Sequence, residues 1–408
     1  MAMARSLVGS SSFFSEKVES VPTPPPSDVI ALHDYTPDEI ESSAELALHL
    51  NANTLAGKVV EGLDLRGPSS ARLSTVDVND TLFVGCHFDD VDTVVDLLRR
   101  GAVVVPAFAS RPYPTHPSRL YTPEDLAAGF AEGGFAAMFD TVVYDHFRAA
   151  GGAVPKVREA LVQRVHDSGI DNALAVFVMT WLTDNGPGKA IGVMGGHAVP
   201  RGHRHYRSAA ELAWRLARAG RLIVTGGGPG VMEAANLGSF LAGHPVEALT
   251  EAIDELAVAP DFRDHDIYTA TALKVRAKFA NNTDHGGLAI PTWLYGHEPA
   301  NLFAAQIAKY FSNAIREDTI LRISRGGIVF APGLAGTVQE IFQAATKTFY
   351  ATDGTSGPFV FLDEEHWTRR LPVRDLLTPL LAASPVGDLS RLIHITDDVN
   401  EAAERLLA

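Results

Sequence analysis

Short apolar segments alternate with amphipathic segments throughout the second half of the chain. The apolar segments are four or five residues long and lie at residues 190–194, 221–225, 287–290, 327–330, 359–362 and 392–395. Between them, helical periodicity marks residues 208–219, 300–322 and 337–350. Strands that alternate with helices in this way predict an α/β domain, with a parallel sheet covered by helices on both faces.

The helix predicted at residues 208–219 has boundary signals at both ends. Ser208 and Glu211 have the spacing of a capping box, and Gly220 follows as a stop signal. We therefore expect this helix to begin at Ser208 and to end before Gly220.

The first half of the chain predicts a smaller α/β unit over residues 28–145. Residues 81–84 and 103–105 are β-like, and residues 89–100 between them carry Val91, Val94, Val95 and Leu98 at helical spacing. Residues 146–188 have a helical pattern that ends in Asp184-Asn-Gly-Pro-Gly188, where we place a domain boundary. No pattern in the N-terminal unit identifies a chemistry, so a regulatory role and a purely structural role both stay open.

Charge narrows the choice of partner. The chain has 408 residues, 46% of them hydrophobic, and a formal net charge of −15 at pH 7. A chain of this length buries a large core and is expected to form two domains. The negative charge repels nucleic-acid polymers and acidic membrane surfaces, so neither is an expected partner. A single nucleotide remains a compatible ligand.

The sequence carries no sign of secretion or of membrane insertion. Residues 1–27 are rich in serine and proline and lack a long apolar stretch, which predicts a flexible tail and not a signal peptide. The longest apolar run, near residues 173–182, is too short to cross a bilayer. Cys86 is the only cysteine, which excludes an internal disulfide and a multi-cysteine metal site. We expect a cytoplasmic protein with Cys86 as a small buried hydrophobe.

A glycine-rich turn follows the segment at residues 221–225. It reads Gly226-Gly-Gly-Pro-Gly230 and opens a helix that begins Val231-Met-Glu-Ala-Ala-Asn236. Glycines at a strand-to-helix turn let the backbone approach a ligand closely, and the free N–H groups at a helix start favour phosphate. A tight turn that only packs the helix against the strand is the alternative, and the segment alone does not decide between them.

A second turn, Pro332-Gly-Leu-Ala-Gly336-Thr-Val-Gln-Glu340, follows the segment at residues 327–330. Two such turns converge on one crevice if their strands are neighbours at the point where the strand order reverses. Thr337 and Glu340 also have the spacing of a capping box, in which the glutamate only satisfies a backbone donor. The spacing alone favours capping.

Arg316 lies on the predicted helix that precedes the second turn. Its guanidinium can hold a phosphate with two parallel hydrogen bonds. The commoner alternative is a solvated charge paired with Glu317 or Asp318.

Taken together, the turn at residues 226–236, Arg316 and the turn at residues 332–340 occur in the order and approximate spacing of the Lonely Guy (LOG) family of phosphoribohydrolases, often mislabelled lysine decarboxylase. Residues 189–408 resemble this family, and the extra N-terminal unit is similar to that of its longer bacterial members, the nucleotide 5′-monophosphate nucleosidases. The resemblance implies a Rossmann-like doubly wound parallel sheet preceded by a smaller N-terminal α/β domain. It also implies hydrolysis of the N-glycosidic bond of nucleoside 5′-monophosphates such as AMP, giving free base and ribose 5-phosphate. It implies no cofactor and no metal. It also implies that the chain forms a homodimer or a larger homo-oligomer.

The resemblance assigns roles to individual residues. Glu340 matches the catalytic glutamate and Arg316 the catalytic arginine. The loop that binds the 5′-phosphate matches Gly333, Gly336 and Thr337, and the facing substrate loop matches Gly227, Gly228, Gly230 and Glu233. Two departures stand out: Leu334 replaces the family's second glycine, and Ala331 adds a residue before Pro332. A side chain at Leu334 is expected to narrow the loop or to conflict with a positive φ.

Histidines in the loop after residues 190–194 are weaker candidates. His203 and His205 have a spacing compatible with metal binding but no partnered carboxylate motif, so together with His197 they are expected to line the crevice or face solvent. Arg201, Arg204 and Tyr206 in the same loop are candidates for contact with phosphate or base, without support from a motif.

Three other functions compete with hydrolysis. A nucleotide-binding or sensing protein that has lost hydrolysis is favoured by Leu334 and by the N-terminal unit. A pyridoxal-phosphate decarboxylase needs a Schiff-base lysine, and no lysine stands in a recognisable setting of that kind. A dinucleotide oxidoreductase is disfavoured, because the turn at Gly226 lacks the Gly-x-Gly-x-x-Gly order and follows the second strand.

Overall fold

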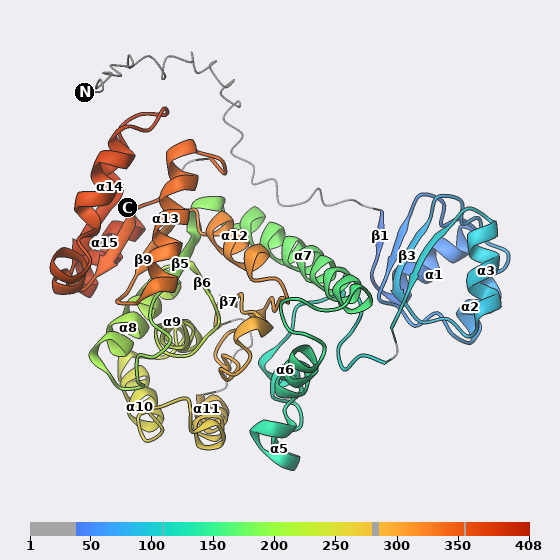
Figure 1. Ribbon diagram of the computed structural model, residues 1–408, viewed down its shortest axis with the longest axis horizontal. Coiled ribbons are helices and arrows are strands. Elements are labelled where there is room, and N and C mark those ends of the chain that lie inside the picture. Colours follow the sequence, from blue (N-terminus) through green and yellow to red (C-terminus); the bar gives the residue numbers. More distant parts are fainter. Residues whose placement is uncertain (1–37, 109, 280–284, 355) are drawn as a thin grey trace, which may run out of the picture.

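Two parallel β-sheets organise the chain (Figure 1). The computed structural model describes residues 38–108, 110–279, 285–354 and 356–408, so the tail predicted at residues 1–27 lies outside the described residues. Among these described residues, one sheet has four strands and the other seven, and both are accompanied by helices. The expected α/β class with a Rossmann-like parallel sheet is confirmed.

The larger sheet has the order β11-β10-β9-β5-β6-β7-β8, and every neighbouring pair is parallel. Six of its strands coincide with the predicted apolar segments to within one residue at each end, and β8 was not predicted. The strands are β5 (Ala190–Met194), β6 (Leu222–Thr225), β7 (Leu288–Ala289), β8 (Gln306–Ile307), β9 (Gly327–Phe330), β10 (Phe359–Leu362) and β11 (Ile393–Thr396).

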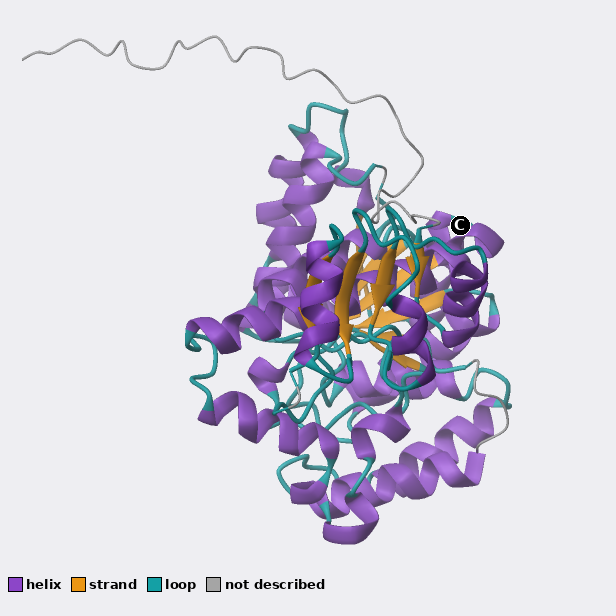
Figure 2. Cartoon of the chain, turned by 90° about the vertical axis from the view of Figure 1, so that its right-hand side faces the viewer, coloured by secondary structure: helices purple, strands orange, loops and turns teal. Residues whose placement is uncertain are grey.

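Figure 2 shows strands at the centre of the molecule with helices around them, and strands of the larger sheet such as β5 and β9 are buried along their whole length. The α-helices that follow β5 along the chain are α8 (Arg204–Arg218), α9 (Val231–Phe240), α10 (Val246–Leu256), α11 (His265–Phe279), α12 (Asn313–Ile323), α13 (Ala335–Tyr350), α14 (Val373–Ala382) and α15 (Val399–Leu407).

Strand β5 is the point at which the strand order reverses. From β5 the chain adds β6, β7 and β8 on one side, and it then returns to place β9, β10 and β11 on the other side. The strands that end in the two glycine turns, β6 and β9, are therefore not neighbours, because β5 lies between them. Doubly wound sheets bind ligands at the carboxyl ends of the strands at such a reversal.

Two helix predictions were wrong. Residues 300–322 do not form one helix: the chain is extended through β8 at the sheet edge, and α12 begins only at Asn313. Many apolar residues of this stretch are buried, including Phe303 and Ile307, so their pattern reflects burial on several sides and not one helical stripe. Helix α8 begins at Arg204 after the N-cap His203, so Ser208 lies inside the helix and forms no capping box.

The smaller sheet has its strands in chain order: β1 (Glu39–Ile40), β2 (Val59–Glu61), β3 (Leu82–Cys86) and β4 (Val103–Pro106). Its helices are α1 (Ser43–Asn51), α2 (Pro68–Leu73) and α3 (Val91–Arg99). Their apolar side chains form a core that is separate from the larger one and that includes Cys86. From Tyr113 onward, buried apolar side chains belong to the larger core, including those from Tyr113 to Val143, in a stretch that was predicted with the N-terminal unit.

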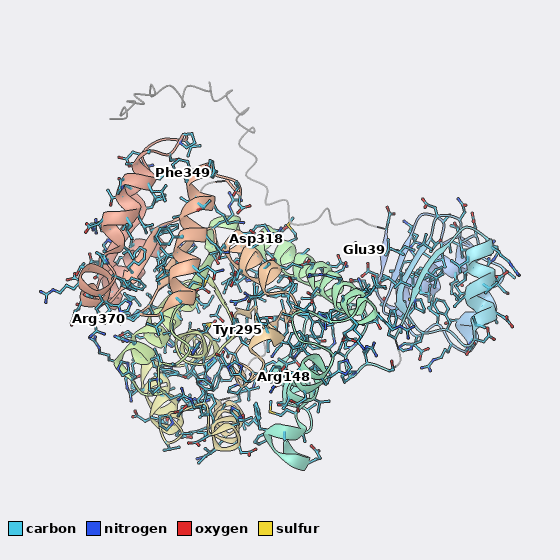
Figure 3. The ribbon with its side chains drawn as sticks, viewed as in Figure 1. Glu39, Arg148, Tyr295, Asp318, Phe349 and Arg370 are labelled. Atoms are coloured by element: carbon cyan, nitrogen blue, oxygen red, sulfur yellow. The ribbon has the colours of Figure 1, made fainter. Side chains whose placement is uncertain are left out.

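The long helix α7 (Val157–Asn185) contacts the small sheet. Asn172 of α7 donates to the carboxylates of Glu39, Glu41 and Glu61 over 3.2–3.3 Å, and Figure 3 shows Glu39 on the side of the small unit that faces α7. Helices α4 (Pro123–Ala127), α5 (Phe130–Gly133) and α6 (Phe139–Ala149) precede α7 along the chain. Within the described ranges, no helix, α7 included, combines the length and the apolar character needed to cross a membrane.

Candidate functional site

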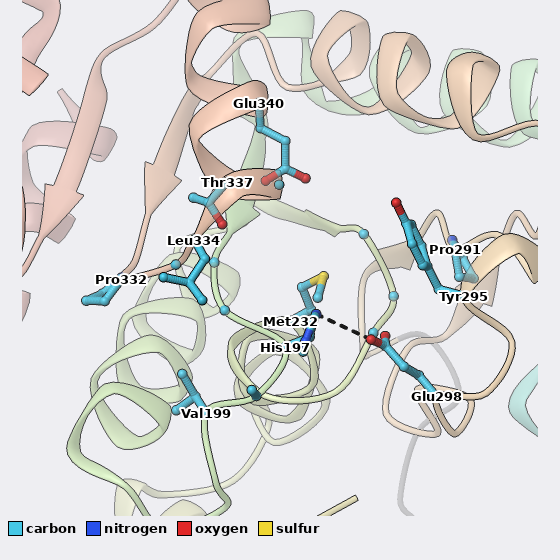
Figure 4. Close-up of a pocket in the computed structure, with 18 of the residues that line it drawn as sticks. His197, Val199, Met232, Pro291, Tyr295, Glu298, Pro332, Leu334, Thr337 and Glu340 are labelled. Atoms are coloured by element: carbon cyan, nitrogen blue, oxygen red, sulfur yellow. Dashed lines mark ion pairs between the residues drawn. The ribbon is translucent and has the colours of Figure 1, made fainter. Parts of the chain in front are cut away.

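A cavity of about 530 Å³ opens at the carboxyl ends of the central strands. The loops that follow β5, β6, β7 and β9 all contribute to its wall (Figure 4). Most of the residues that the sequence singled out line it: Gly227, Gly228, Arg316, Gly333, Gly336, Thr337 and Glu340. Both turns thus line one cavity, although the sequence argument for a shared crevice required neighbouring strands and β5 lies between β6 and β9.

The loop after β5 joins the two turns. The N–H of Gly196 donates to the carbonyl of Pro332 over 3.0 Å, and the N–H of Val231 donates to the carbonyl of Gly196 over 3.2 Å. Gly195 and Gly196 line the cavity but were not singled out from the sequence. The signal was present, because this Gly-Gly pair directly follows a buried strand.

Because the turn after β6 is rich in glycine, two charged side chains can approach its backbone. A Cβ at Gly226 would lie 3.1 Å from Nη1 of Arg316, and one at Gly228 would lie 2.9 Å from Oε2 of Glu298. Gly227 has φ +72° and abuts Pro291, so a side chain there would be strained as well. Gly230, at φ +68°, forms the start of α9 next to the loop after β5 and lies outside the cavity lining.

The turn after β9 leads directly into α13. This helix begins at Ala335 after the N-cap Leu334, and no side chain caps it. Thr337 and Glu340 therefore both lie inside the helix, and the capping-box interpretation was wrong. Gly333 has a specific reason to lack a side chain, since a Cβ there would lie 2.1 Å from Oγ1 of Thr337.

Leu334 does not adopt a positive φ. Its φ is −113°, an ordinary value for any residue, so the expected conflict with a positive φ was wrong. Its side chain lines the cavity edge and is 81% exposed.

Glu340 and Arg316 meet at the cavity wall. Nη1 of Arg316 lies 3.9 Å from Oε1 of Glu340, and both side chains are largely buried. Burial raises the pKa of Glu340 from 4.5 to about 7, with Arg316 opposing the rise and Glu317 adding to it. Figure 4 shows the Glu340 carboxylate pointing into the cavity near Thr337. A carboxyl group with a pKa near neutrality is suited to exchange protons at physiological pH.

Neighbouring polar groups fix the position of Arg316. Its Nη2 donates to Oδ1 of Asn313 over 2.9 Å, and Glu317 lies 3.9 Å away. Glu317 in turn accepts from Asn313 and from Gln339 of α13. The Nε of Arg316 is buried without a hydrogen-bond partner within the described part of the chain. The guanidinium is thus held in place while part of its donor capacity stays unused.

A second carboxylate, that of Glu298, enters from the loop between β7 and β8. It is 11% exposed and lies 3.3 Å from Nδ1 of His197 (Figure 4). Burial raises the pKa of Glu298 and lowers that of His197, so both shifts work against a strong ion pair at neutral pH. Sequence reasoning missed Glu298, because no spacing rule links it to either turn.

Residues 188–250 match the model of the SLOG cluster4 family. The matched segment contains β5, the loop after it, the glycine turn after β6 and helix α9. The SLOG superfamily includes LOG-type proteins. No curated protein matches the chain.

Among solved structures, the chain is similar to the molybdenum cofactor binding protein from the phototrophic bacterium Rippkaea orientalis. The two share 18% identity at a TM-score of 0.30, over 53% of this chain and 93% of that chain. At this TM-score the likeness supports no conclusion about this protein.

Glu233, expected in the substrate loop, lies outside the cavity lining. Its carboxylate is buried and accepts two hydrogen bonds of 2.8 Å from Arg201 and one of 2.6 Å from Tyr206. Arg201 also stacks on the ring of Tyr268. These partners satisfy one another in the core, so the expected contact of Arg201 and Tyr206 with phosphate or base was wrong. Arg204 is paired with Asp363 instead.

His197, His203 and His205 all line the cavity. His205 is bonded to Asp363 over 2.7 Å, and the Nδ1 of His203 accepts the N–H of residue 205. Within the described residues, no group of three or more histidine, cysteine or acidic side chains is arranged to hold a metal ion.

Proposed function

We propose that the protein hydrolyses the N-glycosidic bond of nucleoside 5′-monophosphates, giving the free base and ribose 5-phosphate. The observation that carries the proposal is the pair formed by Glu340 and Arg316, 3.9 Å apart on the wall of one cavity between two glycine turns. The similarity of residues 188–250 to the SLOG cluster4 family supports a nucleotide-related role.

The start of α13 is the proposed phosphate site. Its first turn has no side-chain cap, and Gly336 and Thr337 line the cavity there. Uncapped N–H groups at a helix start, together with the helix dipole, favour an anion. A Cβ at Gly336 would meet nothing within 4 Å, so the turn leaves open space at this point. Arg316 is the nearby cation that suits the same anion.

Glu340 is the proposed catalytic carboxylate. Breaking the C1′–N bond builds positive charge on the ribose ring, and a carboxylate beside the ring stabilises that charge as it forms. The ionised carboxylate also accepts a proton from the attacking water. With a pKa of about 7, Glu340 is substantially ionised at neutral pH and is also basic enough to take this proton.

Anchoring the phosphate fixes the sugar relative to Glu340. Helix α13 carries both the proposed phosphate site and the carboxylate, which are one helical turn apart between Thr337 and Glu340. Positioning of this kind supplies several kcal/mol of the barrier reduction.

A nucleotide sensor without hydrolysis is the second candidate. The observation that favours it is Leu334. Its exposed side chain stands at the rim of the proposed phosphate site, where the LOG family has a glycine.

Incubation of the purified protein with AMP, GMP, CMP, UMP and IMP separates the two candidates. Hydrolysis predicts that free base and ribose 5-phosphate appear in equal amounts from at least one of them. Saturable binding without release of base would favour the sensor. Neither binding nor release for any of the five would contradict both.

A further inference from the structure

Glu298 is an unusual group for the wall of a mostly apolar pocket. Its carboxylate is 11% exposed, and its neighbours in the lining include Met232, Pro291 and Pro299. Within the described residues, its one ion-pair contact is with His197 at 3.3 Å, and no hydrogen bond to its side chain is found. A carboxylate offers about four acceptor positions. Most of the acceptor capacity of Glu298 is thus unused.

Holding a largely buried carboxylate with few donors around it is costly, because it has lost part of its hydration without an equal number of replacement hydrogen bonds. The raised pKa of Glu298 reflects this cost. The position is also held open by the chain, since Gly228 lacks the Cβ that would come within 2.9 Å of Oε2. These features together indicate a group that completes its hydrogen bonds with a ligand.

Glu298 lies on the opposite side of the cavity from the proposed phosphate site. The phosphate turn follows β9 and the Glu298 loop follows β7, and three strand spacings separate these two strands. At the usual spacing this amounts to about 14 Å. Figure 4 shows Thr337 and Glu340 on one side of the cavity and Glu298 on the other. A mononucleotide anchored by its phosphate at α13, with its ribose beside Glu340, directs its base toward Glu298.

We infer that Glu298 is a specificity-determining residue that accepts hydrogen bonds from the Watson–Crick edge of the base, and that the preferred substrate is the guanine nucleotide. This inference rests on the proposed function. An ionised carboxylate only accepts, so it pairs best with two adjacent donors. Guanine presents such a pair, N1–H and the N2 amino group. Hypoxanthine lacks the amino group, and adenine presents an acceptor, N1, beside its amino group.

The test compares the wild type with Glu298→Gln on GMP, IMP and AMP, and on 4-nitrophenyl ribose 5-phosphate as a substrate without a base. We expect wild-type kcat/KM to be highest for GMP. Glu298→Gln is expected to lower kcat/KM for GMP by about 10- to 100-fold, the usual loss for a hydrogen bond to a charged group. The loss of turnover for the nitrophenyl compound should be much smaller than the loss for GMP, since this compound presents no Watson–Crick edge. The preference for GMP over AMP should fall, because glutamine presents a donor group beside an acceptor group.

Glu247→Gln is the matched control, since Glu247 is an exposed glutamate of α10 away from the cavity. It should behave as the wild type on all four substrates. Thermal melting of each variant checks that it is folded. A second measurement needs no change at residue 298. The Glu340→Gln protein should bind GMP about tenfold more tightly than IMP, because the base of IMP lacks the amino group that donates to Glu298.

The outcomes distinguish two failures. A wild type that releases base from none of AMP, GMP, CMP, UMP and IMP overturns the proposed function and this inference with it. Activity in the wild type with an unchanged ratio of GMP to AMP turnover in Glu298→Gln, or a wild type that prefers AMP, overturns the inference alone. If Glu298→Gln does not fold, equal affinity of the Glu340→Gln protein for GMP and IMP would overturn it.

Discussion

Arg316 and Glu340 approach to 3.9 Å although they lie on consecutive helices, α12 and α13, with strand β9 between them in the chain. The contact lies where the strand order of the larger sheet reverses, so the topology brings the cation and the carboxylate to one cavity wall.

Removing the cation is expected to change the pH dependence of hydrolysis. Arg316 opposes the rise in the pKa of Glu340, so Arg316→Met should move that pKa above its value of about 7. The ionised carboxylate is the active form, and activity therefore rises with pH through this pKa. We expect the midpoint of the rise in kcat to shift to higher pH in the variant. A lower kcat with an unmoved midpoint would mean that Arg316 does not act on Glu340.

The charge of Glu340 should also reduce stability at high pH. Its folded-state pKa is raised above the ordinary value of 4.5, so its favourable contribution to folding is complete below pH 4.5 and is lost as pH rises through 7. A rise from 4.5 to about 7 corresponds to about 3 kcal/mol. Glu340→Gln should therefore unfold at higher urea concentration than the wild type near pH 9. Near pH 4 the two proteins should unfold at the same urea concentration. The same difference in urea midpoint at both pH values would contradict this explanation.

Glycines at two positions of the same turn should differ in their tolerance of a methyl group. Gly333→Ala forces a Cβ to within 2.1 Å of Oγ1 of Thr337 and must displace the turn, which we expect to lower kcat/KM by about 10²-fold. At Gly336, a Cβ meets nothing within 4 Å, so Gly336→Ala should fold at least as stably as the wild type. Steady-state kinetics and thermal melting measure both effects. Unchanged kcat/KM in Gly333→Ala would show that crowding against Thr337 does not matter.

Breaking the buried pair of Arg201 and Glu233 should affect folding and not chemistry. Glu233→Gln leaves the guanidinium of Arg201 buried without a carboxylate, which typically costs about 3–5 kcal/mol. We expect a lower urea midpoint and an unchanged kcat per folded molecule. A rise in KM at unchanged stability would instead support the substrate-binding role that the family resemblance implied for Glu233.

Local patterns were sufficient to predict most of the larger sheet. Strands β5, β9 and β10 are short apolar runs that are buried along their whole length. Such runs can be recognised from the local sequence alone, without knowledge of distant contacts. The stretch around Phe303 and Ile307 was mispredicted because its apolar residues are buried by the fold on several sides, which a periodicity argument interprets as a helix. The start of α8 was misplaced because His203 caps the helix, and histidine is not among the usual capping residues.

The site was predictable where its residues follow strands and were part of a motif. Glu340 and Arg316 fell into this group, and the structure adds that Glu340 lies too far inside α13 to be a cap. Glu298 could not be found in this way, because its position depends on how the loop after β7 folds against Gly228. Glu233 was misassigned for the opposite reason: it lies beside the motif in sequence, but its side chain is directed into the core toward Arg201.

Turnover by Glu340→Gln tests the central claim most directly. The variant keeps the size of the side chain and removes the base, so we expect nucleotide affinity, measured by calorimetry, to stay within a few-fold of the wild type. Its kcat for release of base from the best nucleoside 5′-monophosphate should fall by about 10²–10⁴-fold. A Glu340→Gln protein that releases base as fast as the wild type would contradict the assignment of Glu340 as the catalytic carboxylate.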